Sequence, residues 1–250
     1  MLNRIVSVSL LVFIAVSSVF LFCIAVLIWL VTVLFDRRLL LLHRFTSFWA
    51  ALYLWVMPAW SVSVEGREKI LNDQTCVVVS NHQSQLDILV AFRIFFHFKW
   101  VAKTEVFRLP LIGWNMTLNR YIRLKRGDRE SIRQMFDACK KTLAQGSSVY
   151  IFPEGTRSET GIMRPFKPGA FILARQMRVP ILPIVINGTK AALPKHSLNI
   201  SGKHHIRVRV LDEIPYDEFR DLTPEALAEQ VRDRLAREID EHIAAGENEN

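Results

Sequence analysis

The sequence predicts an α/β fold: a largely parallel central sheet flanked by helices, preceded by an N-terminal two-helix membrane-anchoring hairpin. Three observations predict this class. Strand-like apolar runs alternate with helical patterns from residue 61 onward, which is typical of parallel sheets. Two of these runs end in polar loops, and residues 5–35 carry no charged side chain. We therefore expect a hairpin over residues 1–60 and an α/β domain over residues 61–250.

The N-terminal run Ile5–Phe35 is long enough to cross a membrane, which takes about 20 apolar residues. A cleaved signal peptide would have a shorter apolar core and a small-residue cleavage site. The charged residues Asp36–Arg38 follow instead, which favours a retained anchor. Residues 39–60 form a second apolar stretch, rich in aromatic side chains but interrupted by His43 and Arg44. Aromatic residues favour headgroup depth, so we expect a partly inserted hairpin, with a second full span as the alternative.

Seven strands and four helices are expected after the hairpin. The strand-like runs are Ser61–Val64, Cys76–Ser80, Lys99–Ala102, Arg120–Leu124, Ser148–Phe152, Ile181–Ile186 and Ile206–Val210. Helical patterns cover Gln85–Phe96, Arg129–Ala144 and Gly169–Arg178. A last helix opens with Thr223 as a cap, and its apolar stripe of Leu227, Val231, Leu235, Ile239 and Ile243 predicts packing on the sheet.

The net charge of +8 is concentrated between Lys99 and Lys141, where eleven Lys and Arg residues face four Asp and Glu residues. Basic surface suits nucleic acid, anionic lipid or phosphorylated substrates, and the adjoining anchor favours lipid over nucleic acid. The three scattered cysteines indicate neither a disulfide framework nor a zinc site. Arg37 and Arg38 beside the apolar run predict a membrane location, with the α/β domain on the cytoplasmic side of a bacterial inner membrane.

The first polar loop, Ser80–Asp87, follows an apolar strand and contains a candidate general base. The unperturbed pKa of histidine, about 6.5, suits His82 to proton transfer near neutral pH. Asp87 lies five residues on, where it can hold one ring nitrogen while the other accepts a proton. The alternative has no catalytic meaning: Ser84 and Asp87 also match the S-x-x-D pattern of a helix capping box.

The second polar loop follows the strand Val149–Phe152 and reads Pro153–Ser158. Gly155 permits close backbone approach, Thr156 offers a hydroxyl, and Arg157 can bind a phosphate with two parallel hydrogen bonds. The alternative is a surface turn in which Glu154 forms an ion pair with Arg157. A third stretch, Lys103–Arg126, mixes cations with large apolar side chains, as a site for a phosphate-bearing lipid or an ordinary basic surface would.

Taken together, these stretches resemble the sequence blocks of the glycerolipid acyltransferase family, which includes acyltransferases of 1-acylglycerol-3-phosphate. The resemblance covers residues 61–215, with the blocks in the family's order. The matching stretches are Asn81-His82-x-Ser84-x-x-Asp87 for the H-x4-D motif, Lys103-x-Glu105 with Leu109–Trp114, Phe152–Ser158, and Val179–Ile184. The second block usually ends in a hydrophobic residue followed by Asp-Arg. Here Lys125 replaces the Asp and Arg126 is kept, which leaves the acceptor contacts open.

The resemblance implies transfer of an acyl group from a thioester to the free hydroxyl of 1-acylglycerol-3-phosphate, which gives phosphatidic acid. His82 would take the hydroxyl proton and Asp87 would orient the imidazole, as in a catalytic triad whose serine is replaced by the substrate. The implied substrate-binding residues are Asn81, Ser84, Lys103, Arg126, Glu154, Gly155, Thr156 and Arg157. Acyl-CoA or acyl-carrier protein would be the donor, and no metal or other cofactor is implied.

Three alternatives remain open. The acceptor could be another lysophospholipid or a lyso-amino-acid lipid. A lipid hydrolase could use Ser84 as its nucleophile, although the sequence contains no G-x-S-x-G elbow. A non-enzymatic lipid-binding module would use the charge but leave the polar loops without a role.

Overall fold

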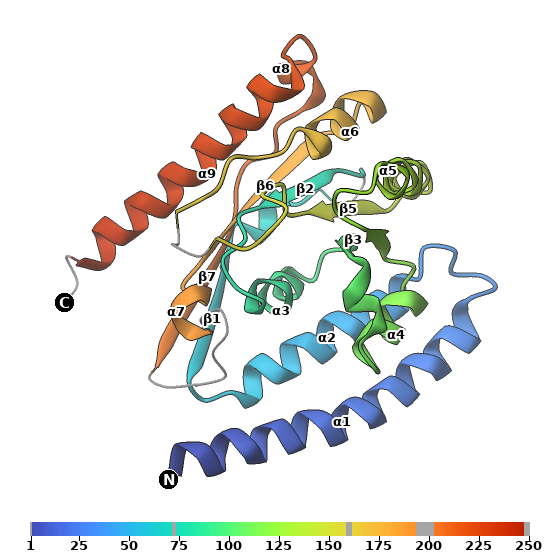
Figure 1. The fold of residues 1–250 in the computed structure, drawn as a ribbon, viewed down its shortest axis with the longest axis vertical. Coiled ribbons are helices and arrows are strands. Elements are labelled where there is room, and N and C mark those ends of the chain that lie inside the picture. Colours follow the sequence, from blue (N-terminus) through green and yellow to red (C-terminus); the bar gives the residue numbers. More distant parts are fainter. Residues whose placement is uncertain (1, 72–73, 159–161, 194–202, 248–250) are drawn as a thin grey trace.

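The computed structural model describes residues 2–71, 74–158, 162–193 and 203–247. Its centre is a seven-stranded sheet in the order β1-β7-β6-β2-β5-β3-β4 (Figure 1). All neighbouring strands are parallel except β6 and β7, so the predicted α/β class with a largely parallel sheet is confirmed. The strands are β1 (Trp60–Glu65), β2 (Val77–Ser80), β3 (Phe98–Lys103), β4 (Ile122–Leu124), β5 (Ser148–Ile151), β6 (Ile181–Asn187) and β7 (His204–Val210).

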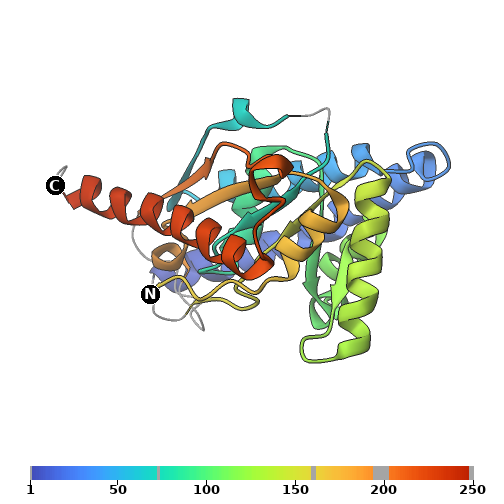
Figure 2. The ribbon, with the colours of Figure 1, turned by 90° about the horizontal axis from the view of Figure 1, so that it is seen from above.

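Helices cover both faces of the sheet (Figures 1 and 2). One face carries α2 (Leu40–Val56) and α3 (Leu86–Ala91), with α1 (Leu2–Thr32) and α4 (Ile112–Leu118) outside them. The other face carries α5 (Arg129–Ala144), α6 (Gly169–Met177) and α9 (Pro224–Glu247). The short elements are α7 (Thr189–Ala192), α8 (Tyr216–Phe219) and the 3₁₀ turns η1 (Arg67–Lys69), η2 (Phe92–Ile94) and η3 (Thr104–Arg108).

Alternation along the central strands divides their side chains between two hydrophobic cores. Val78 of β2 packs in the core beneath α2 and α3, whereas Val77 and Val79 pack beneath α5, α6 and α9. Central strands are therefore buried on both faces, which explains why they read as unbroken apolar runs. The predicted stripe of the last helix is confirmed for Leu227, Val231 and Leu235, which are buried in the second core; the side chain of Ile243 lies outside the described residues.

Helix α3 is shorter than the predicted helix Gln85–Phe96. It ends at Ala91, continues as η2, and the chain turns at Phe95 with a φ of 53°. Phe92, Ile94 and Phe96 are all buried, and alternate residues cannot share one face of an α-helix. The free energy gained by burying these three side chains thus exceeds that of extending the helix, and the chain continues into β3.

The two N-terminal helices pack together, as the hairpin prediction required (Figure 1). Within the described part of the chain, only Val12–Thr32 of α1 is long and apolar enough to cross a membrane. Helix α2 instead buries polar side chains against the α/β part: the His43 Nε2–H group donates to the Phe96 carbonyl at 3.0 Å, and Nδ1 lies 3.0 Å from the Tyr121 hydroxyl. The division of the chain at residue 60 stays a prediction.

Candidate active site

The two polar loops meet at one edge of the sheet because β2 and β5 are parallel neighbours, with Val79 beside Ile151. The second loop binds the backbone of His82 on both sides. Glu154 Oε1 accepts the N–H of His82 at 2.7 Å, and the N–H of Ser158 donates to the His82 carbonyl at 2.9 Å. These two hydrogen bonds hold the histidine in place from a loop more than seventy residues away.

The imidazole of His82 is oriented on two sides. Its Nδ1–H group donates to Asp87 Oδ2 at 2.8 Å. Its ring stacks on Phe152, with centroids 4.0 Å apart and an interplanar angle of 14°. Nε2 makes no hydrogen bond within the described residues, and the His82 side chain lines a cavity. The arrangement leaves one ring nitrogen available to accept a proton there.

The Asp87 carboxylate is fully buried and accepts four hydrogen bonds, so its charge is compensated inside the protein. Besides His82, Oδ2 accepts the N–H groups of Gln83 at 2.6 Å and Ser84 at 2.8 Å. Oδ1 accepts the hydroxyl of Thr189 at 2.5 Å. The Asp87 carboxylate therefore accepts the Ser84 N–H, as the capping-box alternative predicted, and also accepts a hydrogen bond from His82.

Thr189 is a member of this cluster that the sequence did not reveal. It is fully buried at the start of α7, directly after Gly188, whose φ is 84°. It reaches Asp87 across 102 positions of sequence, and a threonine after a strand carries no signal of that contact. Only the adjacency of β2 and β6 brings the two side chains together.

Two of the predicted substrate-binding residues use their side chains within the protein. The Asn81 amide pairs with the backbone of Ile186, donating to its carbonyl and accepting its N–H, both at 2.8 Å. Ser84 Oγ donates to the Leu193 carbonyl at 2.7 Å and accepts the Leu86 N–H at 3.2 Å. Both residues are 1% exposed, and a role for them in substrate binding stays a prediction.

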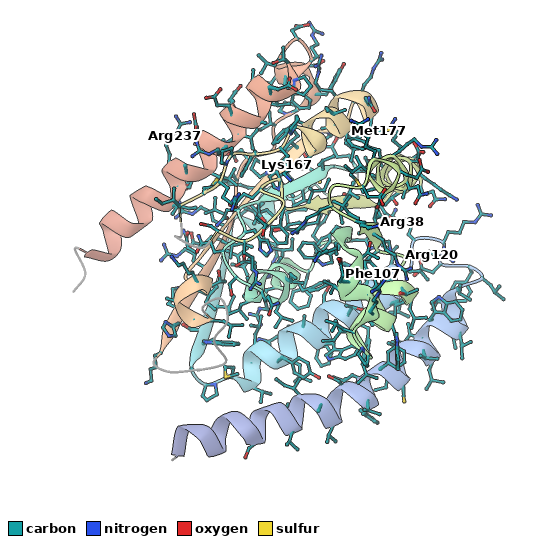
Figure 3. All side chains as sticks on the ribbon, viewed as in Figure 1. Arg38, Phe107, Arg120, Lys167, Met177 and Arg237 are labelled. Carbon is teal, nitrogen blue, oxygen red and sulfur yellow. The ribbon has the colours of Figure 1, made fainter. Side chains whose placement is uncertain are left out.

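Glu154 does not pair with Arg157, the partner considered in the sequence analysis, but with backbone N–H groups. Its second oxygen accepts the Arg164 N–H at 3.0 Å, and no ion pair joins Glu154 to Arg157 within the described residues. Burial raises the pKa of the Glu154 carboxyl. Gly155 has a φ of 71°, and a Cβ on it would lie 3.1 Å from the Lys167 ammonium (Figure 3). Lys167 is not among the site residues predicted from the sequence.

A mainly apolar cavity of about 400 Å³ begins at His82 and Gly155 and extends to the N-terminal helices. Lys103 and Arg126 are its two cationic lining residues, and Lys103 also pairs with Glu105 at 3.2 Å. Thr156 and Arg157 are half-buried and do not line it. Helices α1 to α4 supply aliphatic and aromatic side chains, including Ile14, Trp49, Tyr53, Ile88 and Met116, and strands β3, β4 and β5 supply further lining residues. The cavity therefore joins an imidazole and two cations to a space suited to a hydrocarbon chain.

No group of three or more His, Cys, Asp or Glu residues suited to a metal ion occurs among the described residues. The groups available for chemistry at the cavity are thus the imidazole of His82 with its carboxylate, and the cations of Lys103 and Arg126.

Comparison with known proteins points to one family. A family model described as acyltransferase matches residues 61–187. Over 208 residues the chain is 36% identical to the chloroplastic 1-acyl-sn-glycerol-3-phosphate acyltransferase BAT2 of Brassica napus, covering 82% of this chain and 58% of the relative. It is 33% identical over 227 residues to the chloroplastic 1-acyl-sn-glycerol-3-phosphate acyltransferase LPAT1 of Arabidopsis thaliana, covering 90% of this chain and 62% of the relative. The chain thus spans about three fifths of these relatives.

A solved structure is similar over almost the whole chain. The crystal structure of the 1-acyl-sn-glycerophosphate (LPA) acyltransferase PlsC from Thermotoga maritima matches with a TM-score of 0.79 and 25% sequence identity. The match covers 97% of this chain and 98% of that one, so it includes the N-terminal helices.

Proposed function

The chain belongs to the acyltransferase family, and from that premise we propose that it moves a fatty acyl group from an acyl thioester to the free hydroxyl of 1-acylglycerol-3-phosphate. The product would be phosphatidic acid. One observation carries the proposal: a carboxylate-oriented imidazole with a free ring nitrogen lines a cavity whose lining is mainly apolar and includes two cationic side chains. A lysophospholipid has a hydroxyl, a phosphate and a hydrocarbon chain, which match these three features.

In the proposed reaction, His82 Nε2 takes the proton from the acceptor hydroxyl as its oxygen attacks the thioester carbonyl carbon. A C–O bond forms, the C–S bond breaks, and the departing thiolate receives the proton from the imidazolium. Asp87 holds Nδ1 and stabilises the imidazolium through the 2.8 Å hydrogen bond. Stacking on Phe152 limits rotation of the ring. No covalent acyl-enzyme is required because the thioester is already activated.

The positions of the cations favour different roles from those implied by the motif alone. Lys103 and Arg126 line the cavity and would bind the acceptor phosphate. Arg157 and Lys167 lie beside the same loop outside the lining residues, where they would meet the polyanionic donor, acyl-CoA or acyl-carrier protein. Glu154 would act through His82, whose backbone it holds, while Gly155 would leave room beside the imidazole.

The hairpin would place this cavity at the membrane. The outer face of α1 and the following turn expose large apolar side chains, among them Phe20, Val31, Leu34 and Phe35. The inner face contacts α2, where the hydroxyl groups of Ser18 and Tyr53 lie 2.7 Å apart. Helix α1 packs along α2, and Ile14 of α1 lines the cavity. These contacts favour insertion of the hairpin into one leaflet of the bilayer, from which a lysophospholipid can enter the cavity. A cytoplasmic position at a bacterial inner membrane stays a prediction.

The hydrolase alternative loses support from the position of Ser84, because this residue is buried and its hydroxyl is hydrogen-bonded to the Leu193 carbonyl and the Leu86 N–H. A headgroup-bearing or lyso-amino-acid acceptor stays an alternative within the same chemistry. Thioester release should therefore be measured in detergent micelles with acyl-CoA and acyl-carrier protein against a panel of lyso-acceptors. We expect the highest kcat/KM for 1-acylglycerol-3-phosphate, and a higher value for an acceptor without a phosphomonoester would refute this acceptor.

A further inference from the structure

A cluster of positive charge lies at the turn between α1 and α2, and none of its members lines the catalytic cavity. Its members are Arg37, Arg38, Lys99 and Arg120, and we call it the hairpin-turn cluster. Lys99 is at the amino end of β3, whereas Lys103, at the carboxyl end, lines the cavity. Figure 3 shows Arg38 and Arg120 on the same side of the molecule, beside the turn. The cluster and His82 therefore lie toward opposite ends of the strands.

Lys99 is held by carbonyl oxygens and not by a carboxylate. Its ammonium group donates to the carbonyl of Arg38 at 2.8 Å and to that of Asn119 at 2.9 Å, and the residue is 4% exposed. Burial is the main cause that lowers the pKa of Lys99 to about 7; the charges of Arg120 and Arg38 lower it further, and the charge of Asp36 raises it in part. A buried ammonium beside two guanidinium groups is costly unless an anion compensates it.

The arginines of the cluster likewise lack carboxylate partners. Arg120 donates from Nη1 to the carbonyl of Arg37 at 3.2 Å, and the buried Nε of Arg38 has no hydrogen-bond partner. Within the described residues, no ion pair joins any of the four cations to an acidic side chain. The nearby Asp36 instead accepts the N–H of Leu41. The fold therefore brings four basic side chains together, and the Asp36 carboxylate opposes part of their mutual repulsion without forming an ion pair with any of them among the described residues.

The same turn exposes two apolar side chains: Leu34 is 90% exposed and Phe35 is 72% exposed. Whether α1 crosses a bilayer or lies along it, a turn with this apolar pair beside charged residues belongs at headgroup depth. Phosphate is the anion present there, and arginine side chains bind it through parallel hydrogen bonds. We propose that Arg38 and Arg120, with Lys99 beneath them, form a binding site for the phosphate of an anionic membrane phospholipid, separate from the catalytic cavity.

This site would set how the enzyme sits on the membrane. The carbonyls of Arg38 and Asn119 that bind Lys99 belong to the hairpin turn and to the end of α4, and α4 supplies Met116 to the cavity wall. A phospholipid phosphate bound here would relieve the repulsion between the cations and fix the turn at the headgroup layer. Lipid binding at this site does not depend on which acceptor the enzyme uses.

Vesicle flotation tests the proposal. The full chain and its Arg38→Gln/Arg120→Gln variant are floated with vesicles of phosphatidylcholine and with vesicles of phosphatidylcholine mixed with phosphatidylglycerol. Because each basic residue near an anionic surface contributes about 1 kcal/mol, the variant should lose about 10- to 30-fold in affinity for the mixed vesicles. Its affinity for phosphatidylcholine vesicles should not change. The matched control is Arg175→Gln/Arg237→Gln, which removes the same charge from α6 and α9; Figure 3 shows Arg237 far from the turn.

An equal loss in the control variant would show general charge attraction and overturn the site. Two further measurements make the result specific. In zwitterionic detergent micelles the double variant should turn over at the wild-type rate; a matching fall in turnover would mean that the substitutions disturb the cavity or fold, and would refute a separate site. Stabilisation of the wild type but not of the double variant by inorganic phosphate, without any preference for anionic vesicles, would assign the site to free phosphate and refute the lipid.

Discussion

Replacing Thr189 by valine is the sharpest test of how the catalytic pair is held. Thr189 is fully buried and donates its hydroxyl to Asp87 Oδ1 at 2.5 Å, while Oδ2 holds His82. Valine keeps the branched shape but leaves one carboxylate oxygen without its donor. Because a hydrogen bond to a charged group contributes about 1.5–3 kcal/mol, the total effect corresponds to about 10- to 150-fold in an equilibrium or rate constant.

We expect Thr189→Val to lower kcat by about 10- to 100-fold, with the remainder of the lost free energy appearing as reduced stability to unfolding. The KM values for both substrates should stay within about threefold, because Thr189 does not line the cavity. Without the Thr189 donor the Asp87 carboxylate is held less firmly, so His82 Nδ1 is positioned less precisely, which is why kcat should fall while KM does not.

Steady-state kinetics in micelles, corrected for folded protein by circular dichroism, measure these changes. Thr189→Ser is the matched control, because it retains the hydroxyl and should recover kcat to within about threefold of the wild type. If valine and serine lower kcat equally, or if valine lowers only the unfolding midpoint while kcat stays unchanged, Thr189 has a packing role alone and does not position the carboxylate.

Three further predictions concern the base, the acceptor and the dependence of stability on pH. His82→Ala should lower turnover by at least about 100-fold without loss of vesicle binding, and near-normal turnover would exclude His82 as the base. Arg126→Gln should raise the acceptor KM by about 10-fold or more. Arg157→Gln should raise it less, because of these two arginines only Arg126 lines the cavity. The reverse order of KM values in acceptor titrations would assign the phosphate site to Arg157. Burial, reinforced by the charge of Lys99, lowers the pKa of His43 to about 3, so the folded state keeps this histidine neutral while the unfolded state takes up a proton below about pH 6.5. The free energy of unfolding should therefore fall as pH drops through that value, by up to about 1.4 kcal/mol per pH unit from this group, and urea titrations should show a shallower fall in His43→Gln.

The strands and most helices could be predicted because their signals are local. Helix α5 spans the predicted Arg129–Ala144, and Asp128 caps it by accepting the Ser131 N–H at 3.0 Å. The strands were visible because burial on both faces requires continuous apolar runs. The predicted helix Gln85–Phe96 was too long, because its second half is shaped by the core that it enters and not by helix propensity.

The contact between His82 and Asp87 could also be predicted, since the two residues lie five positions apart and meet across a single turn. The residues that hold this pair in place could not be predicted. Glu154, Ser158 and Thr189 reach this loop from strands that become neighbours only when β5, β2 and β6 assemble. The antiparallel pairing of β7 with β6 is likewise a property of the sheet, and nothing within either strand indicates it.

The sequence by itself determined the class of fold, the apolar N-terminal helix and the pair of residues proposed for proton transfer, because periodicity and short spacing are properties of the chain. Tertiary structure alone decided which cations line the cavity, how Asp87 is held, and that Lys99 lies between arginines at the hairpin turn. Those features arise from contacts between residues distant in sequence, where burial and charge act on neighbours that the order of residues does not reveal.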